Sequence, residues 1–233
     1  MDNKKLDKII IGALILLTII VIVLQAIPLN TNIQELSFEK LGSTENATVY
    51  ISEPIGNLHS NKNIAIIIGV HPRETEEHQM FLKSLLNKQK TLKYKYTVYK
   101  VNVTKDANIS STGRMNGQVA ANKYIVPHIT EQNYNLVIDI HGSEGIGDYD
   151  GHIIFIDPED NNKSIKIANN IKKHMPGIDI FTPTYKTSPK YVVLPIIKSG
   201  TNALILELYQ LMSPENKQRY STLFLKALEQ TEI

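Results

Sequence analysis

The sequence predicts an α/β fold with a mixed, mainly parallel central sheet flanked by helices and preceded by one transmembrane helix. Three short, largely apolar runs, at residues 64–68, 135–140 and 203–207, have the composition of buried strands, and the first is rich in β-branched residues. Apolar residues at helical spacing recur between strand-like segments, which is the pattern of an α/β domain. A much longer apolar run covers residues 9–27 and predicts the membrane helix.

The composition is that of a globular protein with a sizeable core, because 42% of the 233 residues are hydrophobic. The formal net charge is only +2, from 25 basic and 23 acidic residues, and no long basic run favours nucleic acid as a partner. The chain has no cysteine, which excludes disulfides, thiolate nucleophiles and cysteine-based metal sites. A metal must therefore be held by histidine and carboxylate side chains.

The apolar run over residues 9–27 is interrupted only by Thr18 and Gln25 and matches the roughly 20 residues that a membrane-spanning helix needs. It is longer than the apolar core of about 7–15 residues in a cleaved secretory signal. Lysines within residues 1–8 predict a cytoplasmic N-terminus. We therefore expect an uncleaved signal anchor in a single-pass protein of the cell membrane, with the domain that follows outside.

The remainder of the chain is predicted to be a stalk, residues 28–45, followed by one domain, residues 46–233. Residues 181–198 contain Pro183, Pro189 and Pro195 and are expected to form a loop that flanks a site. Besides the buried runs, apolar spacing predicts strands at residues 47–52, 97–103 and 152–156 and helices at residues 74–88, 162–174 and 214–229.

Metal-competent side chains stand at the ends of all the buried strands. His71 and Glu74 follow the first strand as an H-x-x-E pair, His141 follows the second, and Glu207 closes the third. The carboxyl ends of strands are where α/β sheets place their ligands. A catalytic zinc ion commonly takes three protein ligands from histidine and carboxylate, and it leaves one position open. We expect His71, Glu74 and His141 to bind one Zn²⁺ and Glu207 to act as a general base toward water.

Other interpretations of these residues remain open from the sequence. His78 and His152 are competing ligands, ranked lower because neither directly follows a buried strand. His71 and Glu74 also suit the first turn of a helix, where Glu lies near the positive end of the dipole. His141 suits a loop after a strand, and a carboxylate at Glu207 suits a structural ion pair.

The order H-x-x-E, arginine, D-x-H and a strand that ends in Glu resembles the zinc carboxypeptidase superfamily, and most closely its succinylglutamate desuccinylase and aspartoacylase branch. The resemblance covers roughly residues 47–209. It implies that residues 46–233 form a catalytic domain of this type, with His71, Glu74 and His141 as zinc ligands and Glu207 as the general base.

The resemblance also assigns roles to residues between the two halves of the metal site. Arg114 matches the arginine that polarises the scissile carbonyl group, although a surface arginine is nearly as good an interpretation. Asn122 matches the first member of an Asn-Arg pair that binds the substrate carboxylate, but Lys123 replaces the arginine. Lysine offers a point charge instead of a bidentate fork, which changes carboxylate recognition. Asp139 is expected to orient a ligating imidazole.

The function that the sequence favours is a membrane-anchored, extracytoplasmic zinc hydrolase that cleaves an amide bond in a peptide or an envelope peptide. The chain ends soon after Glu207, so the cleft is expected to be open to an extended substrate. Two alternatives remain. One is a deacylase of N-acyl amino acids, and the other is an anchored, non-catalytic binding domain, which the lysine at position 123 favours.

Overall fold

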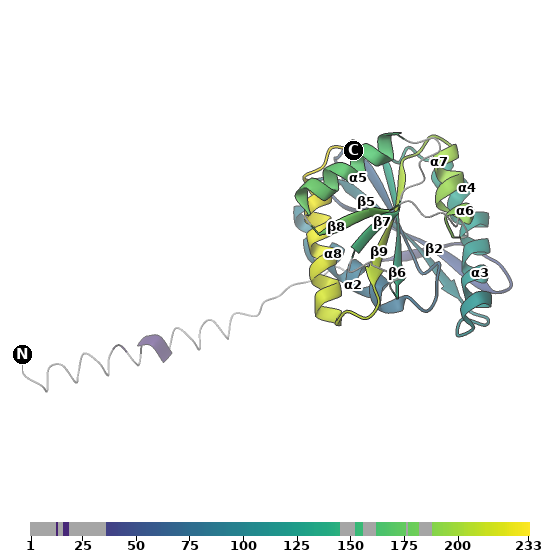
Figure 1. The fold of residues 1–233 in the computed structure, drawn as a ribbon, viewed down its shortest axis with the longest axis horizontal. Helices are drawn as coiled ribbons and strands as arrows, with labels where there is room; N and C mark the ends of the chain where they lie inside the picture. Colours follow the sequence, from purple (N-terminus) through teal and green to yellow (C-terminus); the bar gives the residue numbers. More distant parts are fainter. Residues whose placement is uncertain are drawn as a thin grey trace, which may run out of the picture. The chain divides into compact units, whose positions relative to one another are not determined.

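The structure is a computed structural model that describes residues 13, 16–18, 36–144, 152–155, 162–175, 177–181 and 188–233. Almost all of the predicted anchor, residues 9–27, lies outside the described residues. Within the described part, no helix combines the length and the apolar character that crossing a membrane requires. Glu35–Ile233 forms one compact unit, whose labelled helices and strands are drawn in Figure 1.

One mixed sheet runs through this unit. Its described strands are β1 (Phe38–Ser43), β2 (Ala47–Ser52), β3 (Ile55–Gly56), β4 (Asn63–Ile68), β5 (Lys95–Val103), β6 (Leu136–Ser143), β7 (His152–Phe155), β8 (Ile178–Phe181) and β9 (Ala203–Tyr209). They lie in the order β1-β2-β5-β4-β6-β9-β7-β8, and β3 pairs with β5. The central strands β5, β4, β6 and β9 are parallel, whereas β2 and β7 join them antiparallel. The predicted mixed sheet with a parallel centre is confirmed.

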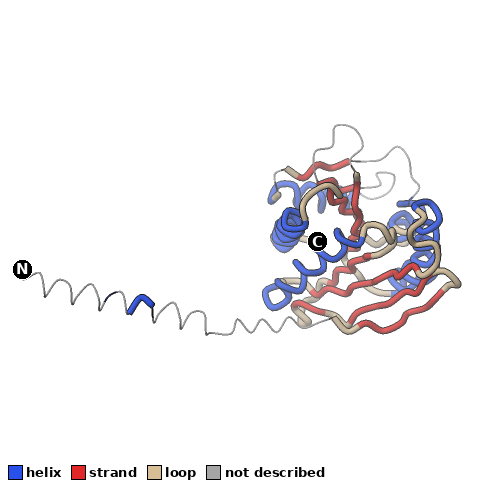
Figure 2. The backbone as a smooth tube through the Cα atoms, turned by 90° about the horizontal axis from the view of Figure 1, so that it is seen from below, coloured by secondary structure: helices blue, strands red, loops and turns tan. Residues whose placement is uncertain are grey.

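Helices cover both faces of the sheet, and Figures 1 and 2 show the strands between the two groups. One group consists of α2 (Thr75–Lys88), α5 (Asn162–His174) and α8 (Pro214–Glu229). The other consists of α3 (Ser110–Ala120), a π-helical turn η2 (Ala121–Ile125), α4 (Val126–Glu131), α6 (Ser188–Tyr191) and α7 (Val193–Lys198), and a short 3₁₀ turn η1 (Gln89–Thr91) follows α2.

A separate apolar core forms on each face of the sheet. Phe81, Leu85 and Phe224 lie in the core beneath the first group of helices, and Ile125 and Ile196 lie in the core beneath the second. Because β4, β6 and β9 contribute side chains to both cores, their sequences are continuous apolar runs and do not alternate with polar residues.

Two expectations about local structure are wrong. The predicted stalk, residues 28–45, includes β1, which pairs antiparallel with β2 at the edge of the sheet. An edge strand needs few apolar residues, so its composition resembles a linker. Residues 188–198, expected to be part of a loop, form α6 and α7. Pro189 and Pro195 lie in the first turns of these helices, where a missing N–H costs little.

Candidate metal centre

The end of β4 delivers the H-x-x-E pair to the edge of the sheet. Gly69 follows the strand with φ of +81°, and a Cβ atom there would lie 2.1 Å from the carbonyl oxygen of Val101. Only glycine fits this turn, because an L side chain would be strained and would also collide with the β5 backbone. The chain then leaves the sheet, so His71 and Glu74 stand in the turn immediately before α2.

The neighbouring strands β6 and β9 deliver the other functional side chains in matching register. His141 is paired with Glu207 across the two parallel strands, and Asp139 lies two residues before His141. Side chains two residues apart in a strand, and those of paired residues in a parallel ladder, share one face of the sheet. The carboxyl ends of three neighbouring strands therefore bring together the residues that the sequence analysis selected as ligands and base.

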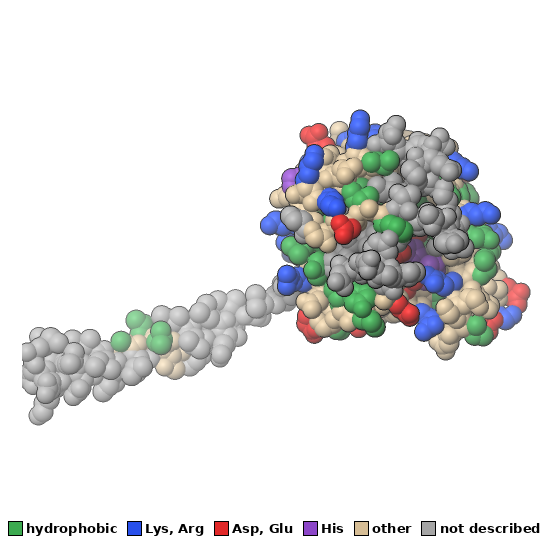
Figure 3. Space-filling view, in the orientation of Figure 1, with side chains coloured by type: hydrophobic (Ala, Val, Ile, Leu, Met, Phe, Trp, Pro, Cys, Tyr) green, Lys and Arg blue, Asp and Glu red, His purple; other side chains and the backbone are tan. Residues whose placement is uncertain are grey.

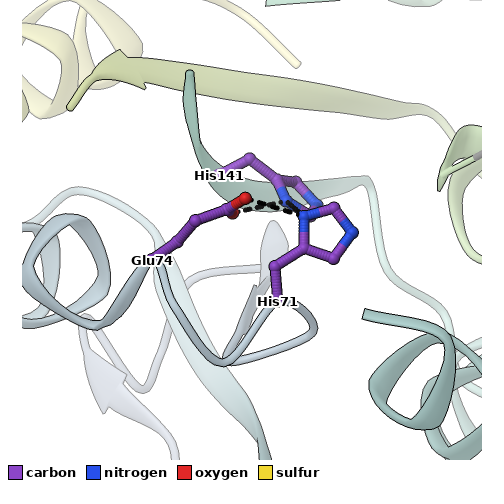
Figure 4. Close-up of side chains that lie close together, drawn as sticks. All are labelled: His71, Glu74 and His141. Carbon is purple, nitrogen blue, oxygen red and sulfur yellow. Dashed lines mark hydrogen bonds and ion pairs between the residues drawn. The ribbon is translucent and has the colours of Figure 1, made fainter. Parts of the chain in front are cut away.

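His71, Glu74 and His141 point toward one another in a buried cluster (Figure 4). The Nδ1 atom of His71 lies 2.8 Å from Oε1 of Glu74, and the Nδ1 atom of His141 lies 2.9 Å from Oε2. The two Nδ1 atoms are 3.0 Å apart. The backbone N–H of Gly142 donates to Oε2 of Glu74 at 3.1 Å, which fixes the carboxylate from the β6 side.

These donors fit one zinc ion. One ligand atom from each of the three side chains lies within 4.8 Å of the others. Ligand atoms at zinc–ligand distances of about 2.0–2.2 Å in a tetrahedron lie roughly 3.3 Å apart, close to the spacing of the imidazole nitrogens here. Two imidazoles and one carboxylate form a known catalytic donor set that leaves one position open. The donor chemistry and the convergence of the side chains agree with the predicted site.

The electrostatics of the cluster favour a cation. Burial favours the neutral form of Glu74, but the charge of His141 and hydrogen bonds from both histidines hold the Glu74 pKa well below its usual range. Burial opposes charge on His141, but Asp139 and Glu74 together raise the pKa of His141 well above its usual range. Two buried carboxylates thus surround one imidazole and stabilise positive charge between them.

His78 has a structural contact and is not part of the cluster. Its Nε2–H donates to the carbonyl oxygen of Ile140 at 2.9 Å. The pairing between β4 and β6 ends at Ile67 and Asp139. Ile140 lies beyond the end of this ladder, and His78 donates the hydrogen bond to its carbonyl oxygen. The lower rank given to His78 as a ligand is consistent with this contact. The side chain of the other competitor, His152, lies outside the described residues.

A cavity of about 380 Å³ opens beside the cluster and is lined by Glu207 and Arg114 together with His71 and Glu74. Figure 3 shows histidine surface in a hollow next to basic side chains. Burial raises the pKa of Glu207 from 4.5 to about 7, and the charge of His141 partly opposes this shift. The carboxyl group can therefore exchange a proton near neutral pH, which is what a general acid–base residue needs.

Arg114 reaches the cluster from α3. Its Nη2 lies 3.0 Å from Nδ1 of His71 and 3.4 Å from Oε1 of Glu74, and about half of the side chain (48%) remains exposed. The guanidinium group therefore stands at the mouth of the site, within reach of both protein and substrate atoms. The role that the resemblance assigned to Arg114 stays a prediction.

Asn122 and Lys123 are not among the described residues that line the cavity. The amide of Asn122 donates to the carbonyl oxygen of Tyr191 at 2.7 Å, and the ammonium group of Lys123 lies 5.2 Å from the ring centre of Tyr124. Their assignment to substrate binding stays a prediction. The cavity is lined instead by residues that the sequence analysis did not select, namely Arg73, Ser110, Gly142, Ser143, Glu144 and Gln210.

Among these residues, Arg73 could have been identified from the sequence. It lies inside the H-x-x-E motif itself, one residue before Glu74, and its side chain is exposed in the cavity wall. Gln118 was also missed, and its Nε2 lies 3.0 Å from Nε2 of His71. No sequence signal marks Gln118 except its position one helical turn after Arg114.

We predict that the purified domain lacking residues 1–30 binds one zinc ion per chain. Replacing His71 or His141 with Ala removes a ligand and should abolish stoichiometric binding, because two remaining ligands hold zinc weakly. Metal content by mass spectrometry after dialysis checks this. His128→Ala is a matched control, since His128 contacts Tyr99 away from the cluster. Full zinc content in His71→Ala or His141→Ala would contradict the assigned ligands.

A second prediction concerns pH and the stability of the metal-free domain. The folded-state pKa of Glu207 lies near 7, above the ordinary 4.5, so the unfolded chain loses its proton first and the free energy of unfolding falls as pH rises between these values. Glu207→Gln removes this loss, which is at most about 3 kcal/mol. Relative to the unaltered domain, the variant should gain thermal stability between about pH 5 and about pH 8.

The control for the pH measurement is Glu45→Gln, because the Glu45 side chain is 81% exposed. Thermal unfolding of all three proteins is followed in chelator at both pH values. If the melting temperature of Glu207→Gln, relative to the unaltered domain, stays constant across this pH range, the Glu207 carboxyl group is not destabilised by burial.

Comparison with known proteins gives matches only at the level of structure. Neither protein-family models nor curated proteins match the sequence. Among solved structures, a metallo-carboxypeptidase from Burkholderia cenocepacia matches with a TM-score of 0.54 and 14% sequence identity, over 84% of this chain and 65% of that chain. The mDAP-bound form of Helicobacter pylori Csd4, a D,L-carboxypeptidase, matches with a TM-score of 0.51 and 12% identity, over 76% of this chain and 53% of that chain.

The chain thus spans between about half and two thirds of the length of these structures. At such low identity the likeness establishes the fold and leaves the activity open. It agrees with the resemblance inferred from the motifs, while the desuccinylase and aspartoacylase branch stays a prediction. The chain thus shares the fold of these carboxypeptidase structures, and His71, Glu74 and His141 form a cluster that can hold a metal ion at the carboxyl ends of its central strands.

Proposed function

We propose that this protein is a zinc-dependent hydrolase of the carboxypeptidase type that cleaves an amide bond in a peptide. The observation that carries the proposal is the pairing of the His71–Glu74–His141 cluster with a proton-exchanging carboxyl group, Glu207, in the wall of the same cavity. A purely structural metal site has no need of that carboxyl group, because it would close all four positions with ligands. A non-catalytic binding domain therefore explains the site less well.

The chain's own residues supply the proton transfers and the orientation of substrate. When bound, zinc acidifies water and polarises a carbonyl group. Glu207 accepts a proton from the attacking water and later donates it to the leaving amine. Arg114 donates hydrogen bonds to the carbonyl oxygen of the scissile bond, where negative charge develops. Glu74 and Gly142 keep the cluster rigid during these steps.

The substrate that best fits the described cavity wall is a polar peptide that carries carboxylate groups. Arg73 and Arg114 bring positive charge to the wall, and Ser110, Ser143 and Gln210 bring hydrogen-bonding groups. Structures of Csd4 hold a tripeptide and mDAP, an amino acid with two carboxylates. By this analogy we propose envelope peptides as the substrate. Asn122 and Lys123 would contact the part of the peptide that extends beyond the cavity.

We predict that Glu207→Gln lowers turnover of the cleaved peptide by about 10²–10⁴-fold, because the glutamine cannot accept a proton. Zinc content should stay at one ion per chain, since Glu207 is not a ligand. Release of free amino acid is measured on short peptides that end in mDAP or in an apolar residue, and on N-acyl amino acids. Glu215→Gln, a surface change in the first turn of α8, is the control.

The same panel separates the proposed function from its alternatives. Activity that persists in Glu207→Gln would show that the assigned base is wrong. Activity on N-acyl amino acids and none on peptides would replace the peptidase with a deacylase. Zinc-loaded protein that cleaves no substrate of either class would favour the binding domain.

We also propose that the protein is anchored in the cell membrane by residues 9–27, with its catalytic domain outside. The support is the length and composition of this run and the lysines before it. The full chain should remain in the membrane fraction after an alkaline carbonate wash, whereas a chain that starts at residue 31 should be soluble. Added protease should degrade the domain in cells whose outer layers are opened but whose membrane is intact. Extraction of the full chain by carbonate would contradict the anchor.

A further inference from the structure

Gln118 contacts the metal cluster from its outer side. It lies on α3, one turn after Arg114, and its side chain is buried with 5% exposure. Its Nε2 atom lies 3.0 Å from Nε2 of His71, whereas Nδ1 of the same ring faces Glu74 and His141. The two nitrogens of His71 therefore face different groups, with the cluster beside Nδ1 and the buried amide of Gln118 beside Nε2.

The chemistry of this contact depends on which nitrogen of His71 carries the proton. An imidazole that binds a metal through Nδ1 keeps its proton on Nε2, so the outer partner must accept a hydrogen bond. The terminal amide of Gln118 faces Nε2 of His71, and this amide carries both a donor, its nitrogen, and an acceptor, its oxygen. A half-turn of the terminal amide exchanges its nitrogen and oxygen without moving the rest of the side chain.

Asp139 stands in the equivalent position behind His141 but offers different chemistry. Its Oδ2 lies 3.0 Å from Nε2 of His141, and an ionised carboxylate only accepts. Asp139 thus favours a proton on Nε2 of His141 whether or not a metal is bound. Gln118 is the partner that can serve His71 in both of its neutral forms.

We propose that Gln118 is a positioning residue that holds His71 with Nδ1 toward the metal by accepting a hydrogen bond from its Nε2–H. The burial of Gln118 restricts the side chain to this contact. Because α3 also supplies Arg114, the same helix sets the position of a metal ligand and of the group that contacts the substrate carbonyl. This inference rests on the metal centre of the proposed function and not on the identity of the substrate.

The test compares zinc affinity, by chelator competition, in the unaltered domain and in two variants. Gln118→Met keeps the side-chain length but neither accepts nor donates, and it should weaken zinc binding by about 10–100-fold, as losses of such outer partners do. Gln118→Glu keeps an acceptor and should bind zinc at least as tightly as the unaltered domain. Asn116→Met is the matched control, because Asn116 lies on the same helix and bonds to Asn46 and Lys105.

A second readout follows the imidazole itself. Nitrogen NMR of the histidine ring should place the proton of His71 on Nε2 in the zinc-loaded unaltered domain and in Gln118→Glu. In zinc-loaded Gln118→Met the Nε2–H signal should exchange faster with water, since the amide acceptor of Gln118 is lost. If Gln118 served only to pack the side chain, Gln118→Met would change neither the position of the His71 proton nor the exchange rate of its Nε2–H.

The outcomes are distinguishable from those of the proposed function. Equal zinc affinity in Gln118→Met and the unaltered domain would overturn the role of Gln118 while the metal centre stands. Weak binding by Gln118→Glu, equal to that of Gln118→Met, would also overturn it. Absence of zinc binding by the unaltered domain would overturn both.

Discussion

The carboxylate of Glu74 is the contact on which the rest of the site depends. Its two oxygens meet His71 and His141, and the backbone N–H of Gly142 holds the second oxygen. These partners come from the turn after β4 and from β6, so one side chain joins two parts of the chain that are far apart in sequence. Removing one partner of a buried charged pair costs about 3–5 kcal/mol, because the other partner is left uncompensated. Ligand geometry and local stability are therefore properties of the same contact.

The fold provides this contact by ending one ladder early. β4 and β6 run in register only as far as Ile67 and Asp139, and the turn at Gly69 then takes the chain away from the sheet. β6 continues alongside β9, so His141 remains in the sheet while His71 leaves it. His71, His141 and Glu74 meet where β4 and β6 separate. His78 donates a hydrogen bond to the carbonyl oxygen of Ile140, which lies beyond the last paired residues of the two strands.

The parts of the fold that the sequence could predict are those with a strong local signal. β4, β6 and β9 are continuous apolar runs, and the ligands His71, Glu74 and His141 stand at or just beyond the ends of such runs. The sequence of β1 resembles a stalk because an edge strand is only partly buried and needs no such run. The structure thus brings the three predicted ligands together, which requires only that parallel strands end at the same edge.

The residues around the ligands are harder to predict from the sequence, because their positions depend on helix geometry. On α3, Arg114 and Gln118 are four residues apart and face the cluster together. The next step of four reaches Asn122, but η2 is a π-helical turn, whose wider spacing rotates the side chains that follow. The Asn122 amide accordingly bonds to Tyr191 and is not part of the described cavity wall. A motif that is matched by residue spacing alone takes no account of a π-helical turn.

Glu207 shows how stability and chemistry oppose each other in this site. β9 places its carboxyl group in register with His141, where burial and, to a smaller degree, the negative charge of Glu74 make ionisation unfavourable. A structural role would be better served by a neutral side chain, because the carboxylate lowers the stability of the metal-free fold as pH rises. A bound cation would reduce this cost of ionisation. A base beside the cation would also serve to activate water. The unfavourable position of Glu207 is thus explained by the proposed reaction at the metal.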